Sequence, residues 1–327
     1  MKALLLKKAF DFDYEERPMP VPRPGEALVR IDAVSVCGSD VHAIKGNQPM
    51  FTFPRVIGHE VAATVVDPNG CASFRTGDRV CLMPCISCGS CAACKMGKPN
   101  CCAKIQLFGV HVDGGMQEYA AFPAKSLLRI DFSAQPEAIS LIEPLTIGAH
   151  AVSRLELNGG EPVLVLGAGP IGVCCALLAR LQGAEVVLAD VSAERREFVQ
   201  KRFDFTLLDP LDASYAVRRG ALTQEQGFYG VVDTTANKSS MDDAFRLICH
   251  GGRVVFLGLF KGTLELDEAA FHMYEPMLCT SRNSTAADFR RIVSYMREGR
   301  IDPMSLLTHT AHFSEAAEAI PRWVRQG

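Results

Sequence analysis

The clearest pattern in the chain is a run of four apolar residues, Val163–Leu166, that leads directly into a glycine-rich turn. A short apolar run bounded by a turn is typical of a buried strand. The residues that follow the turn are mostly apolar again and suit a buried helix. The pattern therefore predicts a strand, a turn and a helix in succession, with the helix beginning at about Pro170.

The turn has the spacing Gly-x-Gly-x-x-Gly, which between a strand and a helix indicates a dinucleotide-binding loop. Gly167 permits the tight turn, Gly169 lets the backbone approach a pyrophosphate, and Gly172 allows helix and strand to pack closely. The first turn of the helix, with Pro170 and Ile171, supplies free N–H groups and positive dipole character for the anion. We therefore expect this loop to bind a nucleotide cofactor.

A second strand, Glu185–Asp190, ends in an acidic residue 18 positions after Gly172. This spacing is close to the roughly 20 residues expected for the carboxylate that binds the adenosine ribose hydroxyls. Because Asp190 would repel a 2′-phosphate, NAD is favoured over NADP. The alternative is a structural glycine turn with an incidental aspartate.

Strand and helix patterns continue to alternate along the chain. Val231–Thr235 and Arg253–Gly258 are predicted as further parallel strands, and Met241–Cys249 as the helix between them. Together they predict an α/β fold with a doubly wound parallel sheet, whose cofactor crevice lies at the carboxyl ends of the strands. Leu257 should then lie near the nicotinamide.

The first 149 residues have a different pattern, in which short strands alternate with turns rich in proline and glycine. This pattern predicts an all-β, barrel-like domain. Examples of the predicted strands are Lys2–Leu6, Ala27–Val36, Val61–Val66, Asp78–Leu82 and Met116–Phe122. From about Thr280 we expect the chain to return to this domain, with a helix over Phe289–Glu298.

The length of 327 residues is large for a single hydrophobic core and indicates about two domains. A formal net charge of −3 gives no electrostatic reason to expect binding to nucleic acid or to an anionic membrane. The apolar start, Met1–Leu6, is too short for a signal peptide and is followed at once by two lysines. Runs of about 18 apolar residues are absent, so no transmembrane helix is expected. We expect a cytoplasmic protein that acts on a small molecule.

Three groups of polar residues offer ligands for a metal ion. They are Cys37-Gly38-Ser39-Asp40-Val41-His42, Gly58-His59-Glu60 and Glu143-Pro144-Leu145. Cysteine, histidine and glutamate are suitable zinc ligands, and a catalytic zinc site needs three of them and one open position. Spacing alone does not prove that the groups converge. Taken singly, Cys37 is more often a small buried hydrophobe and His59 a hydrogen-bonded structural histidine.

Thirteen cysteines in a chain without a secretion signal favour thiolate ligands or free thiols over disulfides. The densest cluster comprises Cys85, Cys88, Cys91, Cys94, Cys101 and Cys102. Cys-x2-Cys steps followed by one more cysteine after a short loop indicate a structural zinc site. Spacing leaves the choice of the four ligands open. An oxidised or redox-active set of cysteines is the alternative.

With these residues in place, the chain resembles the zinc-dependent medium-chain alcohol and polyol dehydrogenases over nearly its whole length. The motifs that carry the resemblance come in the expected order: Gly58-His59-Glu60, Cys88-x2-Cys91-x2-Cys94-x7-Cys102, Glu143-Pro144 and the glycine loop. The resemblance implies a GroES-like β-barrel catalytic domain over residues 1–149 and 281–327, and a Rossmann NAD-binding domain over residues 150–280. It also implies two zinc ions per chain, NAD as the cofactor, and a homodimer or homotetramer.

The resemblance also implies which residues hold the metals. The structural zinc ligands would be Cys88, Cys91, Cys94 and Cys102, which leaves Cys85 and Cys101 as bystanders. The catalytic zinc would be held by Cys37, His59 and Glu60, and Glu143 would bind it directly or through a water.

Further roles follow from the same resemblance. Ser39 would take the substrate proton, with His42 as a further step of the relay. Asp40 would accept the other ring N–H of His59. Arg195, five positions after the ribose-binding aspartate, would flank the adenine, although a solvated basic helix face explains it equally well.

Within the family, four stretches look most like the L-galactonate and L-gulonate 5-dehydrogenases: Gly46-Asn47-Gln48-Pro49, residues 53–60, residues 109–115 and Ser281-Arg282-Asn283. This implies oxidation of the C5 hydroxyl of a sugar acid. Arg282, with Asn283 beside it, would bind the carboxylate, and Lys45 is a second candidate cation. A solvated surface arginine is the alternative for Arg282.

Two other functions stay open at this point. One is a neutral polyol dehydrogenase of the sorbitol type, and the other, from a different class, is a non-catalytic zinc- and NAD-binding regulator. A departure from the family is also visible at the chain end, Trp323 to Gly327, where members usually continue through a last short strand. We expect that strand to be missing or replaced.

Overall fold

The structure is a computed structural model that describes residues 1–326. Gly327, the last residue of the predicted catalytic domain, lies outside the described residues. The chain forms two compact units. Unit 1 comprises Met1–Glu143 and the chain from Thr285 onward, and unit 2 comprises Pro144–Ser284.

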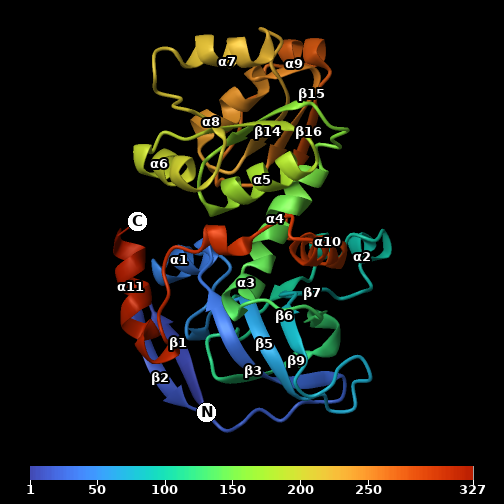
Figure 1. The fold of residues 1–327 in the computed structure, drawn as a ribbon, viewed down its shortest axis with the longest axis vertical. Coiled ribbons are helices and arrows are strands. Elements are labelled where there is room, and N and C mark those ends of the chain that lie inside the picture. Colours follow the sequence, from blue (N-terminus) through green and yellow to red (C-terminus); the bar gives the residue numbers. More distant parts are fainter. Residues whose placement is uncertain (327) are drawn as a thin grey trace. The chain divides into compact units, whose positions relative to one another are not determined.

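Unit 1 is built mainly from antiparallel strands (Figure 1). Its five-stranded sheet has the order β10-β6-β5-β3-β9. These strands are β3 (Glu26–Ser35), β5 (Glu60–Asp67), β6 (Arg79–Leu82), β9 (Tyr119–Pro123) and β10 (Leu127–Ile130). A three-stranded sheet and a two-stranded sheet contain β1 (Lys2–Lys8), β2 (Asp11–Glu16) and β4 (Arg55–Val56), and β7 (Cys85–Ile86) and β8 (Gln106–Leu107), respectively.

Helices complete unit 1. They are α1 (Gly38–Ile44), α2 (Ala92–Lys95), η1 (Pro99–Cys101), η2 (Ala124–Ser126), α3 (Pro136–Ser140), α10 (Ala286–Arg297), η4 (Pro303–Leu306), η5 (Phe313–Glu315) and α11 (Ala316–Gln326). Helix α4 (Ile142–Ser153) starts in unit 1 and continues in unit 2. The prediction of an all-β segment over residues 1–149 therefore missed several short helices, because their few apolar residues give too little periodicity to recognise.

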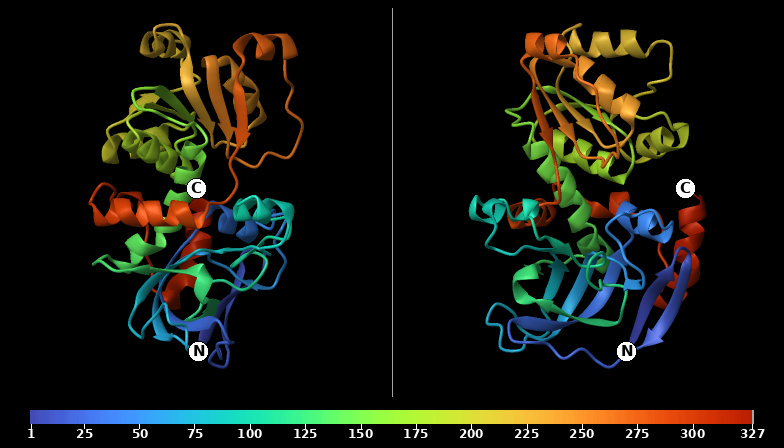
Figure 2. Two further views of the ribbon diagram at one scale, coloured as in Figure 1. Left: turned by 90° about the vertical axis from the view of Figure 1, so that its right-hand side faces the viewer. Right: turned by 180° about the vertical axis from the view of Figure 1, so that it is seen from behind.

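Two hydrophobic cores stabilise unit 1. One is formed by side chains of the five-stranded sheet, such as Val29, Val80 and Phe122. The other lies between β1 and α11, where Ile320 and Val324 pack with the strand's leucines. Figure 2 shows α11 in red beside the blue strands β1 and β2. Helix α11 is thus the last described element of unit 1.

Unit 2 is a six-stranded parallel sheet with helices on both faces (Figures 1 and 2). The strand order is β13-β12-β11-β14-β15-β16. The strands are β11 (Pro162–Leu166), β12 (Glu185–Ala189), β13 (Thr206–Leu208), β14 (Phe228–Asp233), β15 (Ile248–Phe256) and β16 (Met277–Thr280). The helices are α5 (Pro170–Leu181), α6 (Ala193–Arg202), α7 (Tyr215–Thr223), α8 (Lys238–Asp243), η3 (Ala244–Arg246) and α9 (Glu268–Tyr274). The order reverses between β11 and β14, which is where open α/β sheets bind their ligands.

Several predicted elements of unit 2, among them the strand over Arg253–Gly258, have different bounds in the structure. Strand β14 ends at Asp233, because the Asp233 carboxylate accepts a hydrogen bond from the backbone of Thr235 and turns the chain. The predicted helix over Met241–Cys249 is confirmed as far as η3 (Ala244–Arg246) and is wrong at its end, since β15 already begins at Ile248, which pairs with Phe228. Pairing with a neighbouring strand decides these residues, and the local sequence does not contain that information.

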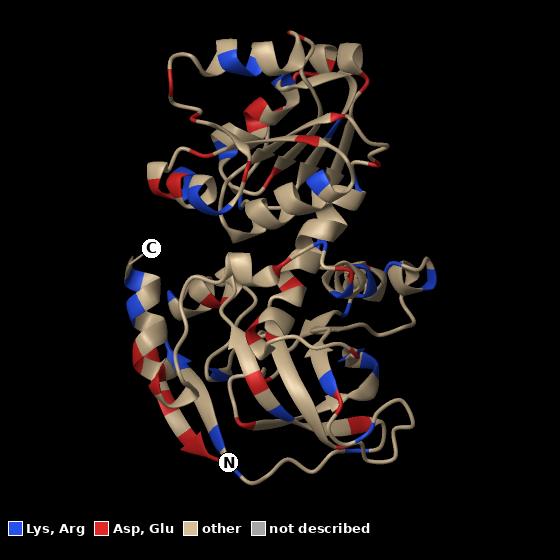
Figure 3. Cartoon of the chain, viewed as in Figure 1, with Lys and Arg blue, Asp and Glu red and all other residues tan. Residues whose placement is uncertain are grey.

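Charged residues of both signs lie side by side over each unit (Figure 3). Helix α6 is an example, with Glu194 in its first turn and Lys201 and Arg202 in its last. This arrangement complements the helix dipole and is typical of a solvated helix face.

Candidate functional site

The register of two strands brings the first pair of candidate zinc ligands together. In the antiparallel pair of β3 and β5, Ser35 lies opposite Glu60. Cys37 follows the end of β3 by two residues, and His59 comes directly before β5. Strand β3 ends and strand β5 begins at the same edge of the sheet, so Cys37 and His59 become neighbours although they lie far apart in the sequence.

The side chains of Cys37, His59 and Glu60 offer three ligand atoms that lie within 4.8 Å of one another. His59 and Glu60 are buried, with exposed fractions of 4% and 3%. Glu143, in the first turn of α4, is also buried and lies outside this set of three, yet close enough for its charge to raise the Cys37 pKa. Sulfur, nitrogen and carboxylate oxygen are the donors of a catalytic zinc site, and the three residues fit that metal.

The His59 ring lies between two residues of α1. Its Nε2 lies 3.4 Å from the hydroxyl oxygen of Ser39, and its Nδ1 lies 3.7 Å from Oδ1 of Asp40. The second distance is longer than a hydrogen bond, so Nδ1 has no hydrogen-bond partner among the described residues. Asp40 instead accepts the backbone N–H of Cys37 at 3.1 Å through Oδ2. Asp40 thus caps the N-terminus of α1. It faces the imidazole of His59, but the distance between them is longer than the hydrogen bond that the sequence predicted.

Burial gathers several ionisable groups into one small volume. Burial, followed by the charges of Asp40 and Glu143, raises the pKa of the Cys37 thiol to about 12. Burial and the neighbouring Cys37 and Glu143 raise the pKa of Glu60 well above its usual range. Acidic groups crowded in this way favour a bound cation, which neutralises their charge and draws off their protons. The electrostatics therefore agree with the ligand geometry.

A glycine-rich loop supports the backbone in front of His59. Gly58 has φ +93°, and a Cβ at this position would lie 2.6 Å from Val34. The loop over residues 109–115 packs against it, and the Gly115 N–H donates to the Gly58 carbonyl at 2.8 Å. The carbonyl of Gly58 would lie only 2.2 Å from a Cβ at Gly114. Close backbone contact of this kind requires glycine.

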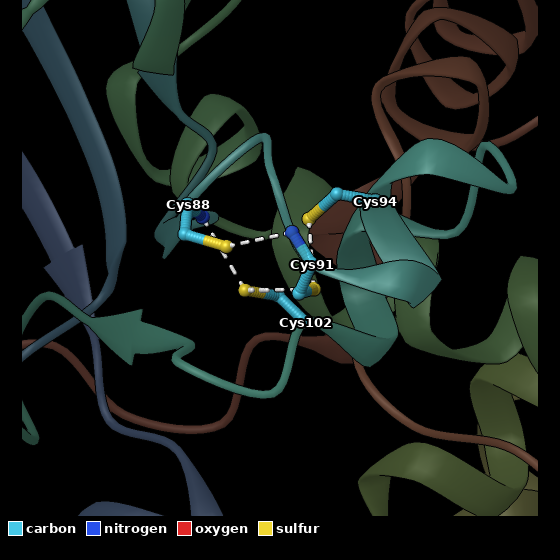
Figure 4. A group of neighbouring side chains, drawn as sticks. All are labelled: Cys88, Cys91, Cys94 and Cys102. Carbon is cyan, nitrogen blue, oxygen red and sulfur yellow. Dashed lines mark hydrogen bonds between the residues drawn. The ribbon is translucent and has the colours of Figure 1, made fainter.

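The structure gathers four of the six clustered cysteines around one point (Figure 4). They are the four that the family resemblance selects: Cys88, Cys91, Cys94 and Cys102. The Cys91 sulfur lies 3.5 Å from that of Cys94 and 3.9 Å from that of Cys102. Cys85, in β7, and the exposed Cys101, in η1, lie outside this group. Four thiols in this arrangement fit a structural zinc ion.

Backbone N–H groups point at these sulfurs. The N–H groups of Cys88 and Lys104 both lie 3.3 Å from the Cys102 sulfur, and that of Cys91 lies 3.4 Å from the Cys88 sulfur. Hydrogen bonds from Ser90 and Cys91 lower the pKa of Cys88 to about 5, whereas burial and neighbouring sulfurs raise the pKa of Cys94 to about 12. The cluster therefore holds one thiolate readily and releases its last protons when a metal ion binds.

In unit 2 the glycine loop follows β11 and leads into α5. Gly167 has φ +98°, and a Cβ there would lie 2.5 Å from the hydroxyl of Thr234. At Gly172, a Cβ would lie 1.8 Å from the Gly167 carbonyl. Gly169 is the N-cap of α5, Pro170 is its first residue and Ile171 its second. The N-terminus of this 12-residue helix thus opens at the point where the sheet order reverses.

Asp190 lies at the end of β12, buried and beside this loop. Its Oδ2 accepts the N–H of Ala168 at 2.7 Å, and its Oδ1 accepts the N–H of Ser192 at 2.8 Å. Each carboxylate oxygen keeps a second lone pair that can accept a ribose hydroxyl. Arg195, in the first turn of α6, lies 3.7 Å from Asp190 through Nη1. Asp190 therefore also fixes the shape of the glycine loop, which the sequence did not indicate.

Other predicted residues have less defined places. His42, in α1, is exposed, and its Nδ1 lies 3.0 Å from Oδ1 of Asn47. Leu257 follows β15 and donates its N–H to the Asp233 carbonyl at 2.9 Å. Arg282 is exposed and Asn283 is half-buried with φ +53°, and both lie at the end of unit 2. His42 thus lies in unit 1 with the candidate zinc ligands, whereas the other three residues belong to unit 2.

Two protein-family models match most of the chain. Residues 23–132 match the alcohol dehydrogenase GroES-like domain, and residues 170–298 match the zinc-binding dehydrogenase domain. The chain belongs to the zinc-dependent medium-chain dehydrogenases. This assignment confirms the predicted α/β fold. It also supports an oxidoreductase that acts on CH–OH groups over a non-catalytic regulator.

Individual relatives within the medium-chain dehydrogenases give information on the class of substrate. It is 42% identical to L-galactonate-5-dehydrogenase of Escherichia coli K12, over 98% of this chain and 95% of that protein. It is 33% identical to the starvation-sensing protein RspB of the same strain, over 98% and 94%. A crystal structure of the alcohol dehydrogenase rspB from E. coli CFT073 with NADH is 31% identical, covers 99% of this chain and 95% of that chain, and has a TM-score of 0.90. The first of these relatives supports a dehydrogenase of sugar acids or polyols.

A membrane-spanning helix is not found within residues 1–326, since none of the helices there combines sufficient length with sufficient apolar character.

Proposed function

We propose that this dehydrogenase oxidises the C5 hydroxyl of L-galactonate or L-gulonate and transfers the hydride to NAD. The observation that carries the proposal is the meeting of Cys37, His59 and Glu60 within 4.8 Å, in a chain 42% identical to an L-galactonate-5-dehydrogenase. The four stretches that resemble the L-galactonate and L-gulonate 5-dehydrogenases support the same substrate class.

The residues of unit 1 would provide a metal and a proton path. Cys37, His59 and Glu60 would hold the catalytic zinc, with Glu143 as a direct or water-mediated ligand. A zinc ion bound there supplies Lewis acidity toward an alcohol oxygen. The hydroxyl of Ser39 would accept the proton of the substrate alcohol, which its distance of 3.4 Å from Nε2 of His59 supports. His42, exposed on the next turn of α1, would pass the proton to water.

The residues of unit 2 would bind the dinucleotide. Gly167, Gly169 and the start of α5 would receive the pyrophosphate, and Asp190 would accept the adenosine ribose hydroxyls. Arg195 would lie against the adenine side of this site. A bound NAD supplies the hydride acceptor, and the protein supplies orientation and electrostatics.

The four clustered cysteines would hold the second zinc in a structural role. Cys88, Cys91, Cys94 and Cys102 leave no open coordination position when all four bind, and a closed site of this kind does not perform chemistry. Its contribution would be to the folding of the loop between β7 and β8.

A neutral polyol is the second candidate substrate, since D-arabinitol dehydrogenase 1 of Uromyces fabae is 28% identical over 98% of this chain. The deciding experiment is a screen of NADH formation with zinc-replete protein over aldonates and polyols. We expect L-galactonate or L-gulonate to give a kcat/KM about 100-fold above that of sorbitol, because a carboxylate adds charge-assisted hydrogen bonds of about 1.5–3 kcal/mol. Equal values would favour the polyol function, and the absence of turnover on every substrate would reject both.

We also propose that the protein is a homodimer or homotetramer. The edge strand β16 exposes Met277 and Leu278, with exposed fractions of 47% and 44%, beside unpaired backbone groups. Apolar edge strands are usually covered, since they otherwise pair with other chains. Light scattering of the purified protein and of a Leu278→Lys variant tests this: the variant should be smaller than the wild type, and equal masses would reject this edge as the contact.

A further inference from the structure

A buried carboxylate ends the strand that pairs with β11, the strand that leads into the glycine loop. Asp233 ends β14, the strand next to β11 at the point where the sheet order reverses. Its side chain is completely buried. Oδ1 accepts the N–H and the hydroxyl of Thr235 at 2.8 and 2.7 Å, and Oδ2 accepts the hydroxyl of Ser240. All three partners are neutral groups, so the carboxylate is held by hydrogen bonds alone.

These bonds set the shape of the segment over residues 234–237. Thr235 is turned back onto the carboxylate, and Ala236 takes the left-handed conformation with φ +53°. Asn237 then caps α8, accepting the N–H of Ser240 at 3.3 Å. The segment is therefore fixed at both ends by the pair Asp233 and Ser240.

The segment in turn contacts both neighbouring strand ends. On one side the Thr234 hydroxyl donates to the Leu166 carbonyl at 2.9 Å, directly below Gly167. On the other side a Cβ at Gly258 would lie 2.4 Å from the Ala236 nitrogen, and the Asp233 carbonyl accepts the Leu257 N–H. A change in this turn would reach the glycine loop and the end of β15 together.

We propose that Asp233 is a positioning residue for the dinucleotide: through Thr235 and Ser240 it holds residues 234–237 as the second wall of the crevice that faces the glycine loop. The inference rests on the proposed use of NAD. A residue needed only for packing would be apolar here, since burial of a carboxylate without a cation is costly. Burial accordingly raises the pKa of Asp233, while Ser240 and Thr235 counteract it.

The test compares matched variants of two buried aspartates. Asp288, 3% exposed at the start of α10 in unit 1, accepts the N–H and hydroxyl of Thr285 at 2.9 and 2.7 Å, much as Asp233 accepts those of Thr235. The variants are Asp233→Ala, Asp233→Asn, Ser240→Ala and the control Asp288→Ala. For each, the Kd for NADH is measured by its fluorescence, with KM for NAD, kcat and the melting temperature.

We expect Asp233→Ala to raise the Kd for NADH and the KM for NAD about tenfold or more, since an acceptor of three hydrogen bonds is removed. The kcat at saturating NAD should stay within about twofold, because Asp233 touches neither substrate nor metal ligand in the proposed mechanism. Asp233→Asn keeps an acceptor for Thr235 and should restore most of the affinity, and Ser240→Ala should be intermediate. Asp288→Ala should lower the melting temperature and leave the NADH affinity unchanged.

Two results would overturn the inference. An unchanged NADH affinity in Asp233→Ala, with only a lower melting temperature, would make Asp233 purely structural. If Asp233→Ala does not fold, Ser240→Ala and Thr235→Val carry the same test, and unchanged affinity in both rejects it. A wild-type protein that binds no NADH would reject the proposed function itself, and this outcome is read before any variant is compared.

Discussion

Gly114 lies so close to Gly58 that a Cβ on Gly114 would lie 2.2 Å from the Gly58 carbonyl oxygen. This contact joins the loop over residues 109–115 to the backbone directly before the candidate zinc ligand His59. The neighbouring Gly115 N–H donates to the same carbonyl at 2.8 Å. The loop therefore acts as a support for the metal site, although none of its residues belongs to the ligand set.

We expect Gly114→Ala to displace Gly58 and to lower both stability and zinc content. Backbone atoms cannot yield as a flexible side chain does, so the cost should be about 1–3 kcal/mol of the free energy of unfolding. Denaturant unfolding and zinc analysis measure the two effects. Gly70→Ala is the matched control, because it carries only the penalty of φ +75° and meets no atom within 4 Å. Equal zinc loss in both variants would show that the contact with Gly58 is irrelevant.

Cys37→Ser should abolish turnover and leave NADH binding largely intact. The candidate catalytic zinc would lose its sulfur ligand, whereas the glycine loop belongs to unit 2. We expect zinc content to fall from about two ions per chain to about one, with activity reduced on the order of 100-fold or more. Parallel loss of activity and NADH affinity would instead mean that Cys37 is needed for folding.

Zinc affinity at the catalytic site should rise with pH. In the metal-free site the pKa of Cys37 is raised to about 12, and that of Glu60 is raised well above its usual range. Zinc binds the deprotonated groups, so each bound ion displaces at least one proton throughout the neutral range, and lowering the pH weakens binding. The expected change is about tenfold per pH unit for each proton displaced. Competition with a chelator between pH 6 and 8, with Cys37→Ser as the reference that lacks this site, gives the slope; a flat profile would contradict the buried thiol.

The local structure of the site could be predicted from the sequence, but the contacts between residues far apart in the sequence could not. The strand, turn and helix around Gly167 are encoded within a few residues, and the structure has α5 beginning at Pro170 as expected. Whether Cys37 and His59 converge depends on the register of β3 with β5, which spacing does not contain. The family resemblance supplied that information where residue patterns left it open.

Asp233 is a second residue whose role could not be predicted from the sequence. The sequence places an acid after an apolar run, Gly230 to Val232, but a strand prediction that continued to Thr235 hid the point where the chain turns. Only the hydrogen bonds from Thr235 and Ser240 show that the carboxylate ends the strand. A buried polar group of this kind is recognised by its hydrogen-bond partners, and the sequence does not show which residues these are.

Asp190→Ala should relax the selection against NADP and also weaken NAD binding. Its carboxylate would repel a 2′-phosphate, and it also accepts the Ala168 N–H within the glycine loop at 2.7 Å. We expect the ratio of kcat/KM for NADP to that for NAD to rise about tenfold or more, and KM for NAD to rise as well. Steady-state kinetics with both cofactors measure this. An unchanged preference for NAD would remove Asp190 from the ribose site and leave it only the loop contact.

Arg282→Ala separates a sugar-acid substrate from a neutral polyol. If the guanidinium binds the substrate carboxylate, KM for L-gulonate should rise about 10- to 100-fold, the value of a lost charge-assisted hydrogen bond. KM for sorbitol, which has no carboxylate, should change little, and Arg282→Lys should recover part of the affinity for L-gulonate. Arg290→Ala, at another exposed arginine, controls for the loss of surface charge. Equal increases in KM for the acid and the polyol would show that Arg282 does not read the carboxylate, and the search for the recognising cation would move to Lys45.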